Sequence, residues 1–177
     1  MDLWKKDGDK VYPKEKIAEL KGNTRNILKG ERVALNLLQR MSGIATLTNK
    51  FVKQIEHTDA KLLDTRKTTP GIRALEKWAV KIAGGENHRF ALYDMIMLKD
   101  NHIDFAGGIA QAIGKTQTYL KETQRDLKII VEARDLDEVK QILACEGVYR
   151  ILLDNFDYKM TEEAVALING KCQTESS

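Results

Sequence analysis

The longest regular pattern in the sequence is a run of apolar residues, spaced three and four apart, between Glu31 and Ile55. That spacing is the period of an α-helix with one apolar side, so it predicts a single long helix. Gly43 interrupts the run at a cost of about 1 kcal/mol relative to alanine, which indicates a close backbone approach or a kink. Residues 1–30 show no such period, and we interpret them as the remnant of a separate sheet-containing piece that leads into the long helix.

Within residues 31–177, short apolar runs alternate with helical patterns after the long helix. The predicted strands are Lys61 to Asp64, Met95 to Leu98, Leu127 to Glu132 and Arg150 to Asp154. The predicted helices are Ile72 to Ile82, Gly108 to Leu120, Asp135 to Ala144 and Thr161 to Ile168. The spacing between strands is long enough for a crossover helix, which is typical of consecutive parallel βα units. An α/β barrel and an open doubly wound sheet both fit this pattern.

Charged residues stand at or just beyond the end of each predicted strand, namely Arg66 with Lys67, Lys99, Glu132 and Asp154. Ligands of parallel α/β folds bind at the carboxyl ends of the strands, so we expect these side chains to converge on one site. Two turn-rich segments, DTRKTTPGIR and NHRF, concentrate further cations that can converge on a ligand. No GxGxxG motif follows a strand, which leaves a dinucleotide-binding domain without support.

Composition narrows the class of protein. The chain has 177 residues, of which 42% are hydrophobic and 31% charged, as expected for a soluble globular protein. Its net charge of +3 is too small, and its basic residues too dispersed, to indicate nucleic-acid binding. No apolar stretch approaches the roughly 20 residues of a membrane span. The start, MDLWKKDGDK, lacks the apolar run of a signal peptide, so we predict a cytoplasmic location.

Six segments carry a resemblance to a known family: ERVALNLLQRMSGIAT, LLDTRKTTPGIRALEKWAV, GGENHRFALYD, IMLKDNHI, VEARDLDE and ILLDN. In order and spacing the chain resembles the quinolinate phosphoribosyltransferases from about Asp7 to Ser177. The resemblance implies a partial parallel α/β barrel of the type II phosphoribosyltransferase kind in residues 31–177, preceded in residues 1–30 by the remnant of an N-terminal mixed α/β domain. It also implies an internal piece of a longer enzyme, without the glycine-rich phosphate loop, which we expect to be inactive or nearly so alone.

The family's reaction joins quinolinate to phosphoribosyl pyrophosphate and yields nicotinate mononucleotide, pyrophosphate and carbon dioxide in NAD biosynthesis. Both substrates are polyanions, for which arginine forks and lysine ammonium groups are suited ligands. By resemblance, quinolinate would be held by Arg66, His88, Arg89 and Lys99. Lys67 would meet the phosphoribosyl substrate, and Ser177 would also be a substrate-binding residue. Arg32 would be donated to the site of a partner subunit, which implies a homodimer or larger homo-oligomer.

Two acids, Glu132 and Asp154, match the carboxylates that the family places near the ribose and its magnesium ion. A Mg²⁺ ion that bridges pyrophosphate oxygens takes only one or two protein carboxylates. The resemblance therefore implies Mg²⁺ as cofactor and assigns catalysis to Lys67, Lys99, Glu132 and Asp154. Because charge stabilisation and positioning can carry this reaction, the chain needs no nucleophilic side chain.

Two alternatives remain open. The first is a related phosphoribosyltransferase that acts on another acid, which a test of quinolinate binding in Arg66→Ala and Arg89→Ala variants would distinguish. The second is a non-catalytic module in which the long helix mediates dimerisation and the basic cluster only binds anions. Among residues outside the motifs' chemistry, we expect Trp78 to lie in the core.

Overall fold

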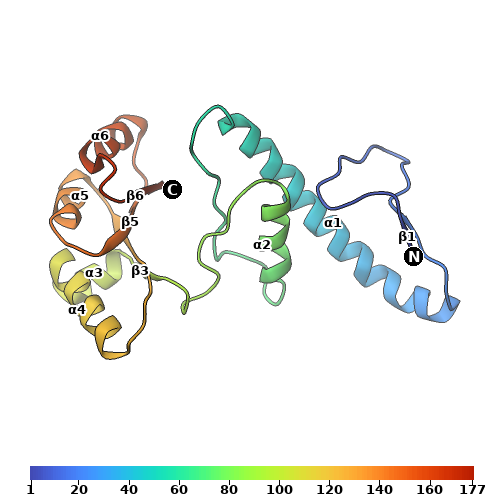
Figure 1. Cartoon of the computed structure of the whole chain (residues 1–177), viewed down its shortest axis with the longest axis horizontal. Helices are drawn as coiled ribbons and strands as arrows, with labels where there is room; N and C mark the ends of the chain where they lie inside the picture. Colours follow the sequence, from blue (N-terminus) through green and yellow to red (C-terminus); the bar gives the residue numbers. More distant parts are fainter. The chain divides into compact units, whose positions relative to one another are not determined.

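The computed structural model describes residues 1–177 and divides into two compact units, Met1–Phe90 and Ala91–Ser177. We call them the N-terminal unit and the C-terminal unit and describe each by itself (Figure 1). No helix in either unit is both long enough and apolar enough to span a bilayer.

The N-terminal unit is built on α1, which spans Thr24–Ile55 and begins seven residues before the predicted start at Glu31. The Asn23 side chain accepts a hydrogen bond from the Asn26 amide, which is the arrangement of a helix N-cap. The helix runs unbroken through Gly43, and a Cβ atom placed there would have nothing within 4 Å. The close backbone approach predicted at Gly43 is therefore wrong.

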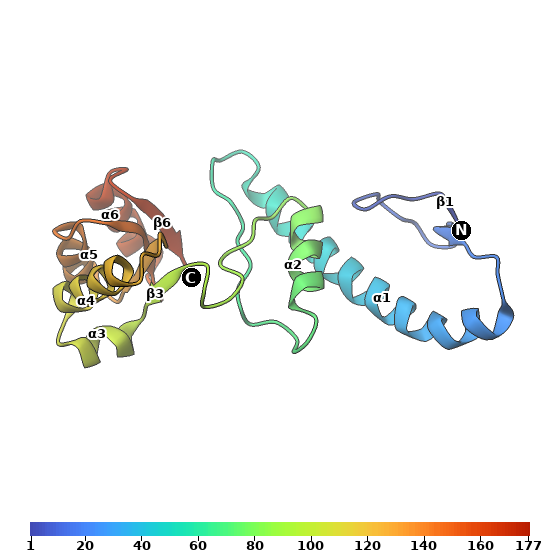
Figure 2. The same ribbon diagram turned by 60° about the horizontal axis from the view of Figure 1, so that its bottom comes forward.

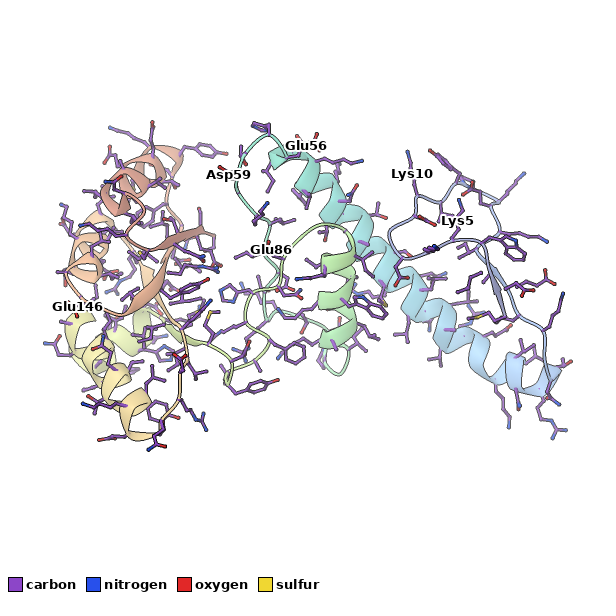
Figure 3. All side chains as sticks on the ribbon, in the orientation of Figure 1. Lys5, Lys10, Glu56, Asp59, Glu86 and Glu146 are labelled. Atoms are coloured by element: carbon purple, nitrogen blue, oxygen red, sulfur yellow. The ribbon has the colours of Figure 1, made fainter.

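Two short strands precede this helix. β1 (Asp2–Leu3) and β2 (Ala18–Glu19) pair in antiparallel fashion, and the Trp4 amide extends the pairing by donating to the Ile17 carbonyl. Figure 3 labels Lys5 and Lys10 on the loop that joins the two strands, where the Lys5 ammonium donates to the Lys10 carbonyl at 3.4 Å. The aperiodic segment before the long helix is thus a small hairpin with a long loop.

The second helix of this unit, α2 (Arg73–Ile82), packs against α1, and the helix predicted over Ile72 to Ile82 is confirmed. Ala79 and Thr48 are buried where the two helices meet. Trp78, however, is 53% exposed, so the prediction that it lies in the core is wrong. The buried residues of α2 are Glu76, Lys77 and Ala79, so two of the three are charged, while the large aromatic Trp78 is exposed.

The predicted strand Lys61 to Asp64 forms only an isolated parallel bridge, between Leu63 and Glu86. The Glu86 amide donates to the Leu62 carbonyl at 2.8 Å, and the Asp64 amide donates to the Glu86 carbonyl at 3.1 Å. The segment is extended, as predicted, and within its own unit this bridge is its strand-like pairing.

The C-terminal unit is an α/β structure with one parallel sheet in the order β3-β4-β5-β6. Its strands are β3 (Ile96–Leu98), β4 (Ile129–Ala133), β5 (Val148–Leu153) and β6 (Gln173–Ser176). Its helices are α3 (Asp100–Ala106), α4 (Ile109–Glu122), α5 (Leu136–Leu143) and α6 (Tyr158–Ile168). The parallel α/β prediction is confirmed; α3 and β6 were not predicted.

All four helices of this unit lie on the same side of the sheet (Figure 2). Alternate strand residues, such as Val131 and Ile151, join the buried cluster with Ile113 and Ile142 from the helices. An open doubly wound sheet would reverse its strand order and place helices on both faces. Strands in sequential order with helices on one side are the arrangement of consecutive barrel units, so this unit supports the barrel type of fold.

Candidate functional site

Two loop segments of the N-terminal unit carry four of the cations selected from the sequence. Residues 64–69 hold Arg66 and Lys67, and residues 86–90 hold His88 and Arg89. The parallel bridge between Leu63 and Glu86 brings the starts of the two segments side by side. The backbone therefore places both loops together before any side chain contributes.

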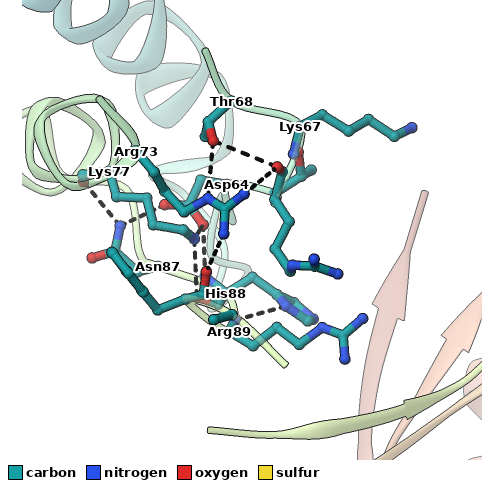
Figure 4. Close-up of polar contacts among 12 residues, drawn as sticks. Asp64, Lys67, Thr68, Arg73, Lys77, Asn87, His88 and Arg89 are labelled. Carbon is teal, nitrogen blue, oxygen red and sulfur yellow. Dashed lines mark hydrogen bonds and ion pairs between the residues drawn. The ribbon is translucent and has the colours of Figure 1, made fainter. Parts of the chain in front are cut away.

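A buried ion pair joins these loops to α2 (Figure 4). The Lys77 ammonium donates to the Asp64 carboxylate and, at 3.1 Å, to the His88 carbonyl. The other Asp64 oxygen accepts from the Asn87 amide group at 2.6 Å, and the His88 backbone amide donates to Asp64 at 2.9 Å. Lys77 is only 3% exposed, so its charge is compensated entirely within the protein.

One turn earlier on α2, the Arg73 guanidinium reaches both loops. Its Nε donates to the Thr68 hydroxyl at 3.0 Å, and its two amino groups donate to the Phe90 carbonyl at 3.1 Å and to the Arg66 carbonyl at 3.4 Å. A planar guanidinium holds its donors in a fixed fork, so these three bonds set the spacing between the segments. Arg73 thus links the backbone of Arg66 to that of Phe90.

Glu76, between these two cations on α2, fixes the turn that follows Lys67. Its carboxylate accepts from the Thr69 amide at 3.0 Å, from the Thr69 hydroxyl at 2.8 Å and from Arg40 of α1 at 2.8 Å. Burial, the largest single influence, would raise the pKa of the Glu76 carboxyl. The bonds from Thr69 and Arg40 together outweigh burial and hold the pKa below its ordinary value of 4.5.

The predicted ligands of the N-terminal unit differ in exposure. Arg66 is half-buried, and its Nε atom is buried with no hydrogen-bond partner. His88 and Arg89 are buried, whereas the exposed side chain of Lys67 extends away from the network (Figure 4). The Arg89 amide donates to Nδ1 of His88 at 2.7 Å, so a neutral His88 ring carries its proton on Nε2 as a donor. Arg32 lies exposed on α1.

In the C-terminal unit, Lys99 directly follows β3, and Glu132 is the second-to-last residue of the neighbouring strand β4. The Lys99 ammonium lies 3.2 Å from the Glu132 carboxylate. Glu132 is 6% exposed whereas Lys99 is exposed, so only the acid of this ion pair is buried. The Lys99 amide donates to Nδ1 of His102 at 3.0 Å and so begins α3 in a fixed orientation. Lys99 therefore stands at the start of α3 as well as at the end of β3.

Asp154 follows β5 on the same face of the sheet as Glu132. Glu132 pairs in register with Leu152, which is two residues before Asp154, and the Asp154 amide donates to the Ala133 carbonyl at 3.0 Å. The Asp154 carboxylate accepts from the Asn155 amide group at 3.0 Å and from the Ser177 hydroxyl at 3.2 Å. The structure thus brings together Lys99 with Glu132, and Asp154 with Ser177.

The donor set fits only a metal ion that takes few protein ligands. No group of three or more His, Cys, Asp or Glu side chains is arranged to hold a metal. Glu132 and Asp154 lie on adjacent strands and offer two hard oxygen donors, which suits a Mg²⁺ ion that keeps its waters and bridges substrate phosphates. The residues present are therefore compatible with the predicted Mg²⁺.

Sequence reasoning missed the residues that hold the loops in place, namely Asp64, Arg73, Glu76, Lys77 and Asn87. The helical period of the sequence does not identify them, because the apolar residues with core-facing spacing lie on another side of α2, namely Leu75, Trp78, Ala79 and Ile82. The charged residues are identified by their burial and their hydrogen bonds in the fold.

A singly wound parallel sheet with helices on one side defines the C-terminal unit as an α/β structure of the barrel type, with Lys99, Glu132 and Asp154 at or next to its strand ends. In the N-terminal unit, two loops carry Arg66, His88 and Arg89. The chain belongs to the quinolinate phosphoribosyltransferase family. Residues 44–177 match the family's model for the quinolinate phosphoribosyl transferase C-terminal domain, and residues 1–42 match that for its N-terminal domain.

Individual relatives agree with this. The chain is 44% identical to the mitochondrial decarboxylating quinolinate phosphoribosyltransferase 2b of Nicotiana tabacum, over 97% of this chain and 52% of that protein. It is 43% identical to a probable nicotinate-nucleotide pyrophosphorylase of Bacillus subtilis, over 99% of this chain and 59% of that one. The structure of the nicotinate-nucleotide pyrophosphorylase from Francisella tularensis superposes with a TM-score of 0.91 at 43% identity, covering 99% of this chain and 61% of that one. The chain thus spans about half to three-fifths of these relatives.

Proposed function

We propose that this chain binds quinolinate and serves phosphoribosyl transfer from phosphoribosyl pyrophosphate, with decarboxylation, to give nicotinate mononucleotide, pyrophosphate and carbon dioxide. The observation that carries the proposal is the pair of loops pinned to α2, which present Arg66, His88 and Arg89 from a fixed backbone. The buried Nε of Arg66 has no partner in the protein, and a buried donor of this kind is satisfied when a ligand accepts from it.

Each cation has a distinct role in this proposal. The guanidinium groups of Arg66 and Arg89 pair with the two carboxylates of quinolinate, and Nε2–H of His88 donates to the same ligand. Lys99 adds a further positive charge for quinolinate. The Lys67 side chain, which is exposed and extends away from the network, binds the phosphoribosyl substrate. No covalent intermediate with the protein is required, because positioned reactants and fixed charges lower the barrier.

The strand-end acids of the C-terminal unit serve the sugar phosphate. Glu132 and Asp154 would hold a Mg²⁺ ion together with the substrate's own oxygens, and Ser177 would bind substrate beside Asp154. When bound, the ion neutralises charge on the departing pyrophosphate. Glu132 also keeps the Lys99 ammonium in place through their 3.2 Å contact, which orients that cation in the absence of substrate.

We further propose that the protein acts as a homodimer or larger homo-oligomer in which Arg32 reaches the site of a neighbouring copy. Exposed apolar side chains along α1 support this, because a solvated helix seldom carries so many: Leu28, Val33, Leu35, Leu38, Leu47 and Phe51. A cytoplasmic location remains a prediction from the sequence. The names of some plant relatives place those proteins in mitochondria or chloroplasts.

Quinolinate binding, measured by titration calorimetry, tests the proposal directly. The chain should bind quinolinate, and Arg89→Ala and Arg66→Ala should each weaken binding by about 2–4 kcal/mol, since each leaves a ligand carboxylate without its cation. Lys81→Ala, which removes an exposed cation at the end of α2, is the matched control and should leave binding unchanged. If the wild-type chain shows no quinolinate binding, or if the control loses as much as Arg89→Ala, the proposed function is wrong.

Turnover is a second readout. Nicotinate mononucleotide formed from quinolinate, phosphoribosyl pyrophosphate and Mg²⁺ can be separated by chromatography, and we expect this chain alone to form little or none. Tight binding of an acid other than quinolinate, with product formed from that acid, would favour the related phosphoribosyltransferase. Anion binding that Arg66→Ala and Arg89→Ala leave unchanged would favour a non-catalytic anion-binding module.

A further inference from the structure

The charged inner face of α2 carries three residues that touch loop backbone. Arg73 and Lys77 lie one helical turn apart, and Figure 4 shows both side chains directed at the two loops. Glu76 lies between them and holds Thr69. None of the three is among the residues assigned to a substrate above.

We propose that Arg73 and Lys77 are positioning residues that set the geometry of Arg66, His88 and Arg89 for quinolinate, an inference that rests on the proposed function. Lys77 is buried and already donates to Asp64 and the His88 carbonyl, so it is committed to the protein. The Arg73 guanidinium donates to three acceptors, two of which are carbonyls of the loops that carry the ligands. All three nitrogens of the Arg73 guanidinium already donate to the protein, and the Lys77 ammonium is buried in its ion pair. Neither cation is therefore available to a substrate carboxylate.

The two residues act on different parts of the same assembly. Lys77, through Asp64, fixes the backbone on both sides of His88, because Asp64 accepts from the His88 amide while Lys77 donates to the His88 carbonyl. Arg73 fixes the far ends, joining the Arg66 carbonyl to the Phe90 carbonyl. Loss of either contact leaves the ligand-binding side chains chemically intact but displaced.

Displacement of this kind has a measurable size. A shift of about 1 Å in a binding group can cost about 100-fold in function. Arg73 is the better probe because it is half-buried, whereas removal of the buried Lys77 risks unfolding the unit. We expect Arg73→Gln to weaken quinolinate binding by at least about tenfold, and Arg73→Lys, which keeps the charge but loses the fork, to recover only part of that loss.

Two control variants of α2 separate positioning from general destabilisation. Ala79→Gly weakens the same helix at a buried position whose methyl side chain cannot hydrogen-bond to either loop, and Lys81→Gln removes an exposed cation. Both should keep quinolinate affinity within about twofold of wild type when compared at a temperature where every variant is folded. Equal losses in Arg73→Gln and Ala79→Gly, after equal lowering of Tm, would overturn the proposal.

A double-mutant cycle tests whether Arg73 acts through Arg66. In an Arg66→Lys background, which keeps weak binding, Arg73→Gln should cost less than about threefold, because the group that Arg73 positions has already changed. Full additivity of the two losses would show that Arg73 acts independently of Arg66 and would refute the positioning role.

Hydrogen exchange followed by mass spectrometry supplies a readout that needs no ligand. Arg73→Gln should speed exchange in residues 66–70 and 87–91, whereas Ala79→Gly should speed it mainly within α2. If the wild-type chain binds no quinolinate, only the proposed function is refuted. The exchange pattern would still decide the positioning role. Unchanged exchange in both loops would overturn it.

Discussion

Replacing Asp64 by asparagine removes the only carboxylate that contacts the buried Lys77 ammonium. The cation then lies in a site where it is 3% exposed, with the His88 carbonyl and a neutral amide oxygen as acceptors. Breaking a buried ion pair by removing one partner costs about 3–5 kcal/mol, because the remaining charge is left uncompensated. Since two acceptors remain for Lys77, we expect Asp64→Asn to lower the free energy of unfolding of the N-terminal unit by about 3 kcal/mol.

Tryptophan fluorescence during denaturant unfolding measures this quantity in the correct part of the chain. The two tryptophans, Trp4 and Trp78, both belong to the N-terminal unit, so their signal reports that unit alone. Asp137→Asn is the matched control, because it breaks an exposed pair with Lys140 in the C-terminal unit. Exposed pairs of this kind contribute at most about 1 kcal/mol, and the fluorescence transition should not move.

The double variant Asp64→Asn/Lys77→Met completes the cycle. Removing the cation as well abolishes the uncompensated charge. The double variant should therefore lose about 1–3 kcal/mol less free energy of unfolding than the sum of the two single losses. If Asp64→Asn costs less than about 1 kcal/mol, or if the two losses simply add, the pair does not hold the loops as argued. Quinolinate affinity should fall together with the stability of the Asp64→Asn variant.

Three further predictions concern other contacts. Because the pKa of Glu76 is lowered in the folded chain, its carboxylate stabilises fully above pH 4.5 and this contribution is lost as pH falls through the lower folded pKa. Glu76→Gln should therefore cost about 1–3 kcal/mol at pH 7, with the deficit shrinking toward pH 3 in unfolding curves; a deficit that grows with acid would contradict this. Gly85→Ala should lower Tm, at a cost of about 1–3 kcal/mol, because a Cβ atom would lie 2.8 Å from Val80 Cγ1, whereas Gly43→Ala, with open space around it, should raise Tm. Glu132→Gln should weaken the Mg²⁺-dependent binding of inorganic pyrophosphate by about tenfold in calorimetry, and equal binding with and without Mg²⁺ in wild type would contradict the role of the metal.

Most of the C-terminal unit could be predicted from the sequence because its strands are continuous apolar runs with helices between them. β4 is buried along its whole length, which is why Ile129–Ala133 stands out as an apolar segment. β6 could not be found in this way, since Gln173–Ser176 is polar and mostly exposed and is a strand only by pairing with β5. The short α3 was hidden inside a motif, where its start depends on the contact between Lys99 and His102.

The same distinction explains what was found and missed among the candidate site residues. Arg66, His88, Arg89 and Lys99 belong to short motifs whose residue types match the charges of a polyanion. The residues that position them are identified only by three-dimensional contacts, because a charged residue on a helix is solvated by default. On α2 that default fails, since Glu76 and Lys77 are buried whereas Trp78 beside them is exposed. Besides the apolar burial of Ala79, the buried charges of this helix require specific hydrogen bonds to replace those they lose to water. In this chain those bonds end on the backbone of the two loops, which is where a binding site gains most from rigidity.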